Sequence, residues 1–162
     1  MKEIEDFLAR CARGDENTRT CVGLNFPSTL SPRYRASLIE PSKRWTEWAL
    51  SLHAQNKTRE VQKFVEMDVA VLRIGDVGIV GMACESFLGI GRQIRKGSKL
   101  PLAVPCGYMD SNIAYVQDSP NVGDRDYSSS YYRYTNGFLP YKKPAGDLLA
   151  KAAVRQLRRL SK

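Results

Sequence analysis

Hydrophobic residues recur at helical spacing near the start of the chain. A spacing of three or four positions predicts a short helix that ends at Gly14. Its apolar face consists of Ile4, Phe7, Leu8 and Cys11. The polar stretch 15–32 follows, and its prolines Pro27 and Pro32 predict a long connection. A second helix is predicted to run to about Ala54. Its apolar face consists of Trp45, Trp48, Ala49 and Leu52.

The hydrophobic period changes to two between Val61 and Ile74, which predicts a strand. One face is apolar throughout, and the other begins with acidic residues and then becomes apolar. The first face consists of Val65, Met67, Val69 and Val71, and the second of Glu66, Asp68, Ala70, Leu72 and Ile74. Strands that are apolar on both faces are typical of positions buried on both sides of a sheet. We therefore expect this strand to run from a half-exposed end into a fully buried one.

A tight β-hairpin is predicted next, because Gly75 and Asp76 join this strand to the apolar run 77–82. A helix closed by Gly97 follows, with Phe87, Ile90, Gly91 and Ile94 on one face. A third strand covers 102–104 and ends at Cys106 and Gly107. The last helix covers about 146–160, with Leu149, Ala153, Leu157 and Leu160 on one face.

These elements predict a layered α/β fold, with a mixed β-sheet whose central hairpin is flanked by helices. We expect residues 1–162 to form a single α/β domain. Within it, residues 1–60 form a helical N-terminal segment and linker, and residues 61–160 form the sheet-and-helix region.

Composition narrows the class of protein only a little. The chain has 162 residues, of which 43% are hydrophobic, and this predicts a folded globular protein. No stretch approaches the roughly 20 apolar residues that span a bilayer, and the acidic N-terminus is unlike a signal peptide. A net charge of +8 is compatible with nucleic acid, anionic lipid or acidic substrates. The local cluster of Arg155, Arg158, Arg159 and Lys162 favours a solvated helix end.

The four cysteines do not predict a metal site. No two of them form a Cys-x-x-Cys pair and no histidine is nearby in the sequence, which argues against a zinc knuckle. The cysteines are Cys11, Cys21, Cys84 and Cys106. Cys84 and Cys106 lie in apolar strands and are interpreted as buried thiols. His53 is the only histidine, and its place beside the apolar face of a helix favours a surface or capping role.

Glu85 is the main candidate for chemistry. It follows the apolar hairpin directly, at the point where the next helix is expected. Ligands and catalytic groups gather at such strand-to-helix edges of α/β sheets. The alternative is a carboxylate in the first helical turn, where the helix dipole favours it.

Tyr115 is the natural neighbour of Glu85, because it follows the third strand and two strand ends can meet at one sheet edge. A carboxylate and a phenol can both give oxygen ligands to a metal. Two ligands fall short of the roughly four partners of a zinc site. A buried hydrogen bond between Tyr115 and Glu85 explains the pair equally well.

These residues resemble the neutral/alkaline (non-lysosomal) ceramidase superfamily. The run from Leu72 to Glu85 is similar to a family hairpin that ends in a zinc-binding Glu, and Gly91-Arg92 is similar to an element of the helix that follows. The segment 107–116 resembles a family motif whose second Tyr contacts zinc, which corresponds to Tyr115. The run 144–149, with its helix, is similar to the end of the catalytic domain. The resemblance covers roughly 61–160 and corresponds to the C-terminal half of that domain.

The chain also departs from the family pattern. Ala83-Cys84 stands where the family has Pro-Gly, and Asn112 stands where it has the first Tyr of the pair. The family's two zinc-binding histidines and its nucleophilic Ser have no counterpart. The string 118–121 is similar to the nucleophile motif, but it follows Tyr115, has no predicted general base nearby, and is interpreted as a turn.

The resemblance implies part of a zinc-dependent amidohydrolase that acts on an N-acyl amide such as ceramide. Glu85 and Tyr115 would bind the metal, and this chain would contribute no catalytic residue. The other ligands would come from a missing N-terminal half or a second chain, so the chain alone would be inactive. The alternatives are a non-catalytic scaffold or binding protein that keeps the fold, and a basic nucleic-acid-binding module.

An aromatic-rich segment spans 127–141 and has three interpretations: packing of a long loop onto the sheet, the wall of a substrate pocket, or stacking on nucleic-acid bases. Its aromatic residues are Tyr127, Tyr131, Tyr132, Tyr134, Phe138 and Tyr141. No recognisable nucleic-acid-binding module carries them, which disfavours the last interpretation.

Overall fold

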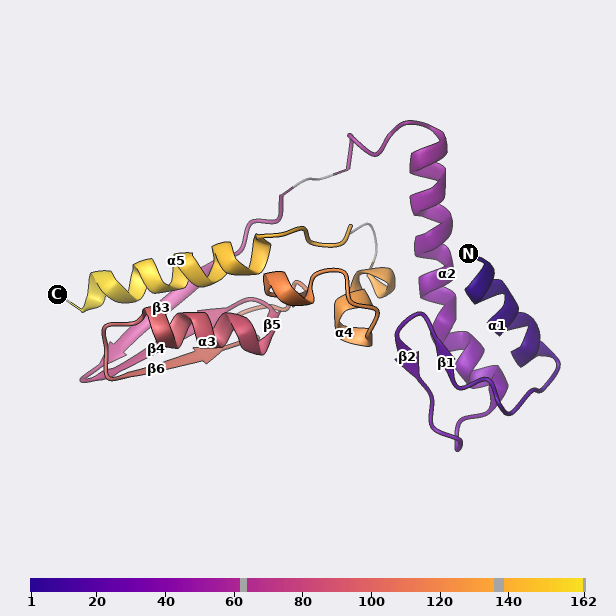
Figure 1. Ribbon diagram of the computed structural model, residues 1–162, viewed down its shortest axis with the longest axis horizontal. Coiled ribbons are helices and arrows are strands. Elements are labelled where there is room, and N and C mark those ends of the chain that lie inside the picture. Colours follow the sequence, from indigo (N-terminus) through magenta and orange to yellow (C-terminus); the bar gives the residue numbers. More distant parts are fainter. Residues whose placement is uncertain (62–63, 136–138, 162) are drawn as a thin grey trace. The chain divides into compact units, whose positions relative to one another are not determined.

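The computed structural model describes residues 1–61, 64–135 and 139–161, and the chain forms two compact units (Figure 1). Unit 1 comprises Met1–Phe64 and Asp124–Pro140, and unit 2 comprises Val65–Gly123 and Tyr141–Lys162. The chain therefore leaves unit 1 close to the boundary expected at residue 61 and returns to it at residue 124. The predicted α/β class is confirmed by the helices and the mixed sheet of unit 2.

Unit 1 is built on two helices, α1 (Lys2–Ala12) and α2 (Pro32–Ala54), and a small hairpin of β1 (Thr20–Cys21) and β2 (Leu24–Asn25). The helix expected to end at Gly14 is confirmed by α1. Pro32 was expected to break the chain but lies at the start of α2, where a proline has no amide hydrogen to lose. Ser31 Oγ accepts a hydrogen bond from Tyr34 N at 3.3 Å and caps the helix.

A buried arginine fixes the connection between α1 and α2. Arg35 is fully buried, and its Nη1 donates to the carbonyl oxygens of Glu16 at 2.8 Å and Thr18 at 3.0 Å. Its Nη2 donates to the Ser28 carbonyl at 3.3 Å. One guanidinium therefore connects three points of the polar stretch that was expected to be a long connection.

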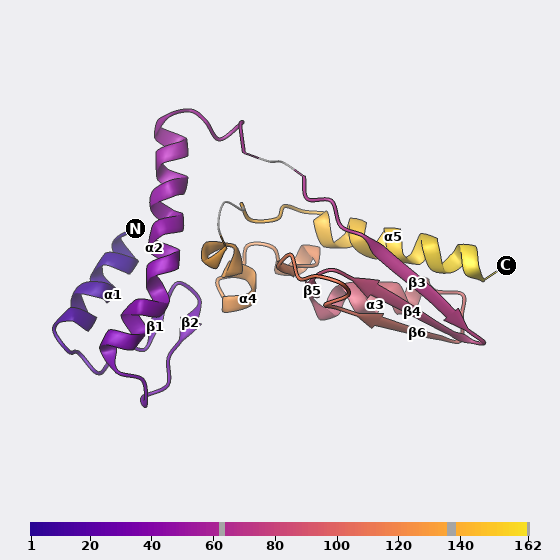
Figure 2. The same ribbon diagram turned by 180° about the vertical axis from the view of Figure 1, so that it is seen from behind.

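Unit 2 contains a three-stranded sheet in the order β3-β4-β6. Strand β3 (Val69–Ile74) pairs antiparallel with β4 (Val77–Met82) through the predicted Gly75-Asp76 turn, where Gly75 has φ +57. Strand β6 (Leu102–Cys106) pairs parallel with β4. Figure 1 shows the sheet behind helix α3 (Leu88–Gly97), and Figure 2 shows its opposite side.

Helix α3 and helix α5 (Ala145–Leu160) cover one face of this sheet, as their predicted apolar stripes require. Val80 and Met82 from β4, Ile90 and Ile94 from α3, and Leu157 from α5 are fully buried in the core between these layers. Both helices begin and end close to the predicted positions.

The first strand differs from its prediction. Strand β3 begins at Val69, not near Val61, and Gln62 and Lys63 lie outside the described residues. Val69 and Val71 pack on the core as expected. The other face was expected to be buried, but Leu72 is 54% and Ile74 62% exposed. The prediction of burial on both faces is wrong for this structure, because α3 and α5 lie on the same side of the sheet.

The remaining elements are short. They are β5 (Glu85–Ser86), β7 (Tyr115–Val116), the 3₁₀ turns η1 (Ser119–Asn121) and η2 (Tyr131–Tyr134), and α4 (Tyr127–Ser130). All four cysteines are free thiols. Cys84 is buried as predicted and Cys106 is partly exposed. His53 is exposed in the last turn of α2.

Candidate functional site

Glu85 and Tyr115 lie directly beside each other. They are partner residues in the short parallel pair formed by β5 and β7. Glu85 N donates to Ala114 O at 3.0 Å, and Phe87 N donates to Val116 O at 3.0 Å. The expectation that the two residues are neighbours is confirmed. Glu85 lies three residues before α3, so the alternative position in the first helical turn is wrong.

The loop between β6 and β7 lies against the chain just before Glu85. Tyr108 N donates to Cys84 O at 3.1 Å, and Ile113 N donates to Ala83 O at 2.9 Å. A Cβ at Gly107 would lie 2.6 Å from Cys84 O, so glycine is required for this close approach. Tyr108 has φ +58, a left-handed conformation that few side chains adopt.

Three side chains of this segment donate hydrogen bonds to the Glu85 carboxylate. Asn112 Nδ2 donates to Oε1 at 3.3 Å, and the phenols of Tyr108 and Tyr115 also donate to the carboxylate. Desolvation by burial would raise the pKa of Glu85, but these three hydrogen bonds outweigh it and hold the pKa below its usual value. The carboxylate is therefore ionised at neutral pH.

The sequence pattern does not identify Tyr108 or Asn112 as site residues. Asn112 differs from the family motif at its position, and Tyr108 matches no part of it that binds zinc. Both residues lie in the segment 107–116, between the end of the third strand and Tyr115. Their place in this connecting segment is the feature of the sequence that could have identified them. The left-handed backbone of Tyr108 could not be anticipated, because a tyrosine rarely adopts it.

The carboxylate–phenol cluster of Glu85, Tyr108, Asn112 and Tyr115 meets only part of the requirement for a metal site. Its donors are one carboxylate, two phenols and an amide, and zinc sites usually have about four ligands with nitrogen or sulfur among them. Among the described residues, no three His, Cys, Asp or Glu side chains come together in a way that could hold a metal ion. The role of Glu85 and Tyr115 as zinc ligands stays a prediction, and further ligands are needed.

Ser119 lies in a turn as predicted, but a carboxylate lies beside it. Its hydroxyl donates to Asp147 Oδ2, and Gln93 Nε2 donates to Asp147 Oδ1 at 2.8 Å. The expectation that no possible base lies nearby is therefore wrong. The hydrogen bonds from Ser119 and Gln93 lower the pKa of Asp147, and a carboxylate with a lowered pKa is a weak general base. The contact joins η1 to the first turn of α5.

The aromatic-rich segment packs mostly within unit 1. The rings of Trp45 and Tyr132 meet edge to face at 4.9 Å, and Tyr134 Oη donates to Val22 O at 3.2 Å. Tyr127, Tyr131 and Tyr134 cluster together. Tyr141 instead packs on the core of unit 2. The packing interpretation fits this arrangement, except that the support is α2 and not the sheet. Phe138, Asn136 and Gly137 lie outside the described residues.

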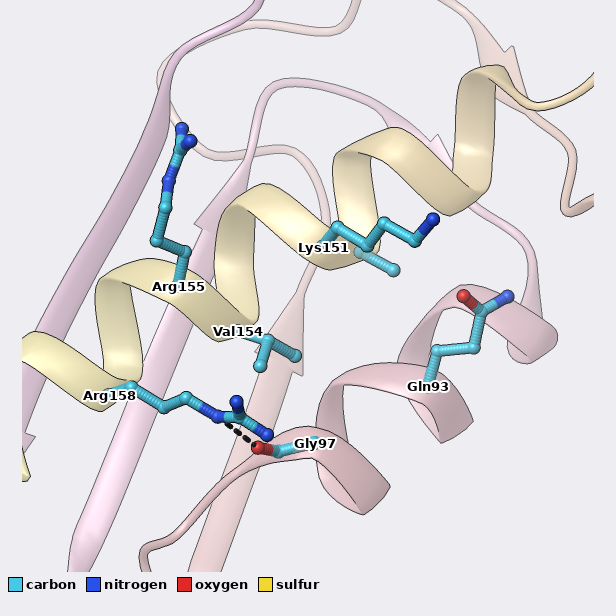
Figure 3. Close-up of a pocket in the computed structure, with 7 residues that line it drawn as sticks. Gln93, Gly97, Lys151, Val154, Arg155 and Arg158 are labelled. Carbon is cyan, nitrogen blue, oxygen red and sulfur yellow. Dashed lines mark hydrogen bonds between the residues drawn. The ribbon is translucent and has the colours of Figure 1, made fainter.

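A second surface feature is a shallow groove of about 430 Å³ between α3 and α5 (Figure 3). Lys151, Arg155 and Arg158 line its α5 side, and Gln93 and Gly97 line its α3 side. Arg158 Nε donates to Gly97 O at 3.1 Å. The groove is cationic and carries none of the chain's aromatic residues.

No protein-family model, no curated protein and no solved structure matches this chain. No helix in the described parts of the chain has the length and apolar character needed to cross a membrane.

Proposed function

We propose that this chain supplies part of a zinc-dependent amidohydrolase that is similar to neutral ceramidase. The observation that carries the proposal is the pairing of Glu85 with Tyr115 at a strand end, where Asn112 and the phenols of Tyr108 and Tyr115 donate hydrogen bonds to the carboxylate. None of the ion pairs between described residues involves Glu85. An ionised carboxylate at a strand end, with further oxygen groups beside it, is suited to a divalent metal.

In this proposal Glu85 and Tyr115 give two oxygen ligands, and Tyr108 and Asn112 orient the carboxylate by hydrogen bonds. Bound zinc would polarise an amide carbonyl and activate the attacking oxygen. The remaining ligands and the nucleophile come from outside this chain. The chain alone is therefore inactive, and an N-acyl amide such as ceramide is the expected class of substrate for the completed enzyme.

Zinc content tests this proposal. The chain is mixed with the N-terminal half of a complete neutral ceramidase that ends before its own hairpin, and bound zinc is measured by mass spectrometry after gel filtration. We expect zinc in the mixture, little zinc with the chain alone, and loss of zinc with Glu85→Gln. Glu66→Gln, at an exposed carboxylate of the same unit, is the matched control and keeps the metal. Absence of zinc from the mixture contradicts the proposal and favours a non-catalytic scaffold.

A second candidate function is binding of a polyanion at the groove between α3 and α5. Eight cationic side chains lie on these helices or just after α3, and the helices contain one acid, Asp147. The cations are Arg92, Arg95, Lys96, Lys99, Lys151, Arg155, Arg158 and Arg159. This concentration of charge favours a phosphate-rich partner such as nucleic acid. The lack of aromatic side chains in the groove disfavours stacking on bases.

A further inference from the structure

The sheet of unit 2 has one face that its own helices leave uncovered. Register determines this open face, because side chains alternate along each strand and paired residues point the same way. It consists of Ala70, Leu72 and Ile74 from β3, Val77, Ile79 and Gly81 from β4, and Leu102, Val104 and Cys106 from β6. Leu72, Ile74 and Leu102 are each more than half exposed. None of the nine residues is charged.

A one-sided antiparallel hairpin normally alternates apolar with polar residues, so that its outer face is compatible with water. The outer face here shows no such alternation in β3, β4 or β6. The largest contiguous apolar patch on a typical monomeric protein covers about 300–600 Å² and is often functional. The strands are therefore suited to burial between two layers, and the described structure supplies one of them.

The carboxylate–phenol cluster begins close to the end of the open face. Met82 and Cys84 belong to the core. Gly81 belongs to the open face, and Glu85 follows it four residues later, after the bend at Ala83-Cys84. Val116 also belongs to the core, so Tyr115 points the other way and lies on the same side as Glu85. The Met109 side chain covers Gly81, because its Cε lies 2.5 Å from the position that a Cβ on Gly81 would take. The cluster therefore lies just beyond the end of β4, within four residues of the open face.

We propose that the open face is the docking surface for the complementary half of the enzyme, an inference that rests on the function proposed above. The occupant is a polypeptide layer that presents uncharged apolar side chains to β3, β4 and β6. At the rim nearest Glu85 it carries the imidazole or carboxylate groups that the cluster lacks. An uncharged partner follows from the uncharged face, because a charge buried there would have no partner.

The size of the face argues against a second copy of this chain as the occupant. Three strands about 4.8 Å apart, with five or six residues each at about 3.3 Å per residue, cover roughly 300 Å². A stable complex buries about 800 Å² per partner. A symmetric dimer through this face alone falls short of that area. A complementary half that extends beyond the sheet, past Met109 to the cluster, does not have this limit.

Binding between the full chain and the N-terminal half of a complete neutral ceramidase tests the docking surface, with affinity from calorimetry and zinc measured on the same samples. Leu72→Glu places a charge at a half-exposed position of the open face without removing a core contact. Leu148→Glu is the matched control, since Leu148 is 57% exposed on α5. We expect Leu72→Glu to weaken binding at least tenfold and Leu148→Glu to leave it unchanged.

The outcomes separate the two proposals. Binding and zinc that are both insensitive to Leu72→Glu overturn the docking surface and leave the proposed function in place. Binding that is lost with Leu72→Glu but never carries zinc supports the docking surface and overturns the function. Failure of the wild-type chain to bind overturns the docking surface. The wild-type chain alone is also checked for dimers. If it is dimeric and Leu72→Glu makes it monomeric, the open face binds a second copy of the chain, and the proposed docking of a complementary half is overturned.

Discussion

The charge on Glu85 depends on the hydroxyl groups around it. Burial disfavours the ionised form, whereas the hydrogen bonds from Tyr108, Tyr115 and Asn112 favour it, and the second effect is the larger. The pKa of this carboxyl is lower in the folded chain than in the unfolded chain. Ionised Glu85 therefore stabilises the fold above the ordinary pKa, and this contribution is lost as the pH falls through the folded value.

Removing one phenol hydroxyl tests this balance. In Tyr115→Phe the carboxylate loses a donor while the ring remains, so we expect the pKa of Glu85 to rise toward its usual value. The free energy of unfolding falls by about 1 kcal/mol at neutral pH. The measurement is a carbon-detected NMR titration of the Glu85 carboxyl. Tyr34→Phe, at an exposed tyrosine of α2, is the control. An unchanged titration in Tyr115→Phe would show that this hydroxyl does not stabilise the carboxylate.

Arg35 carries the second residue-scale prediction. Its planar fork donates to three backbone carbonyls at once, whereas a lysine ammonium cannot reproduce that geometry. Buried acceptors left unpaired cost about 1–3 kcal/mol, so we expect Arg35→Lys to lower the stability of unit 1 by about that amount. Arg33→Lys, at the exposed neighbour, is the control and has little effect. Both tryptophans, Trp45 and Trp48, lie in unit 1, so their fluorescence follows its unfolding in denaturant.

At the scale of elements, local patterns predicted the sheet-and-helix region well. The hairpin was identified from Gly75-Asp76 because a two-residue turn needs a glycine, and Gly75 has φ +57. The predicted stripes of α3 and α5 are confirmed at Ile90, Ile94 and Leu157, which are fully buried, whereas Leu160 at the end of α5 is 38% exposed. These features depend on residues close together in the chain, and the sequence contains that information.

Most contacts between residues far apart in the chain could not be predicted from the sequence. The hairpin of β1 and β2 turns at Val22-Gly23, and Val22 has φ +40, a conformation that β-branched residues avoid. It is held from outside, since Glu3 Oε1 accepts from Val22 N at 2.9 Å and Tyr134 Oη donates to Val22 O. At the candidate site, the pairing of Glu85 with Tyr115 was predictable from two strand ends. The contribution of Tyr108 was not, because it depends on the path of an irregular loop.

Replacing two glycines of unit 2 by alanine is expected to change its stability in opposite directions. A Cβ at Gly107 meets the backbone oxygen of Cys84, which cannot move aside without displacing the strand, so we expect Gly107→Ala to destabilise unit 2 by about 1–3 kcal/mol. Gly91 lies inside α3, and a Cβ there would make only ordinary van der Waals contact with Pro105, at 3.7 Å. There alanine improves helix propensity, and Gly91→Ala stabilises by about 0.5–1 kcal/mol.

Amide NMR signals of unit 2 in denaturant measure both glycine variants. Tryptophan fluorescence would miss the effect, because both tryptophans belong to unit 1. If Gly107→Ala were as stable as the wild type, the close approach of the 107–109 loop to Cys84 would be wrong, and with it the position of Tyr108 beside Glu85.

At the scale of the whole chain, charge is distributed unevenly. The net charge of the chain is +8. Helices α3 and α5 together with Lys99 carry eight cations and one acid, an excess of seven positive charges. The two sides of the unit 2 sheet therefore differ in chemistry. The helical side is cationic and the open side is apolar. Two kinds of partner are separable by experiment, because salt weakens contacts to the first side and scarcely affects contacts to the second.

Salt dependence of oligonucleotide binding gives the last prediction. If the groove binds phosphates, affinity for a single-stranded oligonucleotide falls steeply with salt, with a log–log slope of about −0.7 per phosphate neutralised. Arg155→Gln and Lys151→Gln then each reduce the slope by about one contact, whereas Arg33→Gln in unit 1 leaves it unchanged. Fluorescence anisotropy at several salt concentrations measures the slope. Two outcomes would contradict binding at the groove: affinity that does not change with salt, or an equal loss of affinity in Arg33→Gln. The cations of α5 would then serve only to solvate the surface and to compensate the helix dipole. The open sheet face would remain as the binding surface of unit 2.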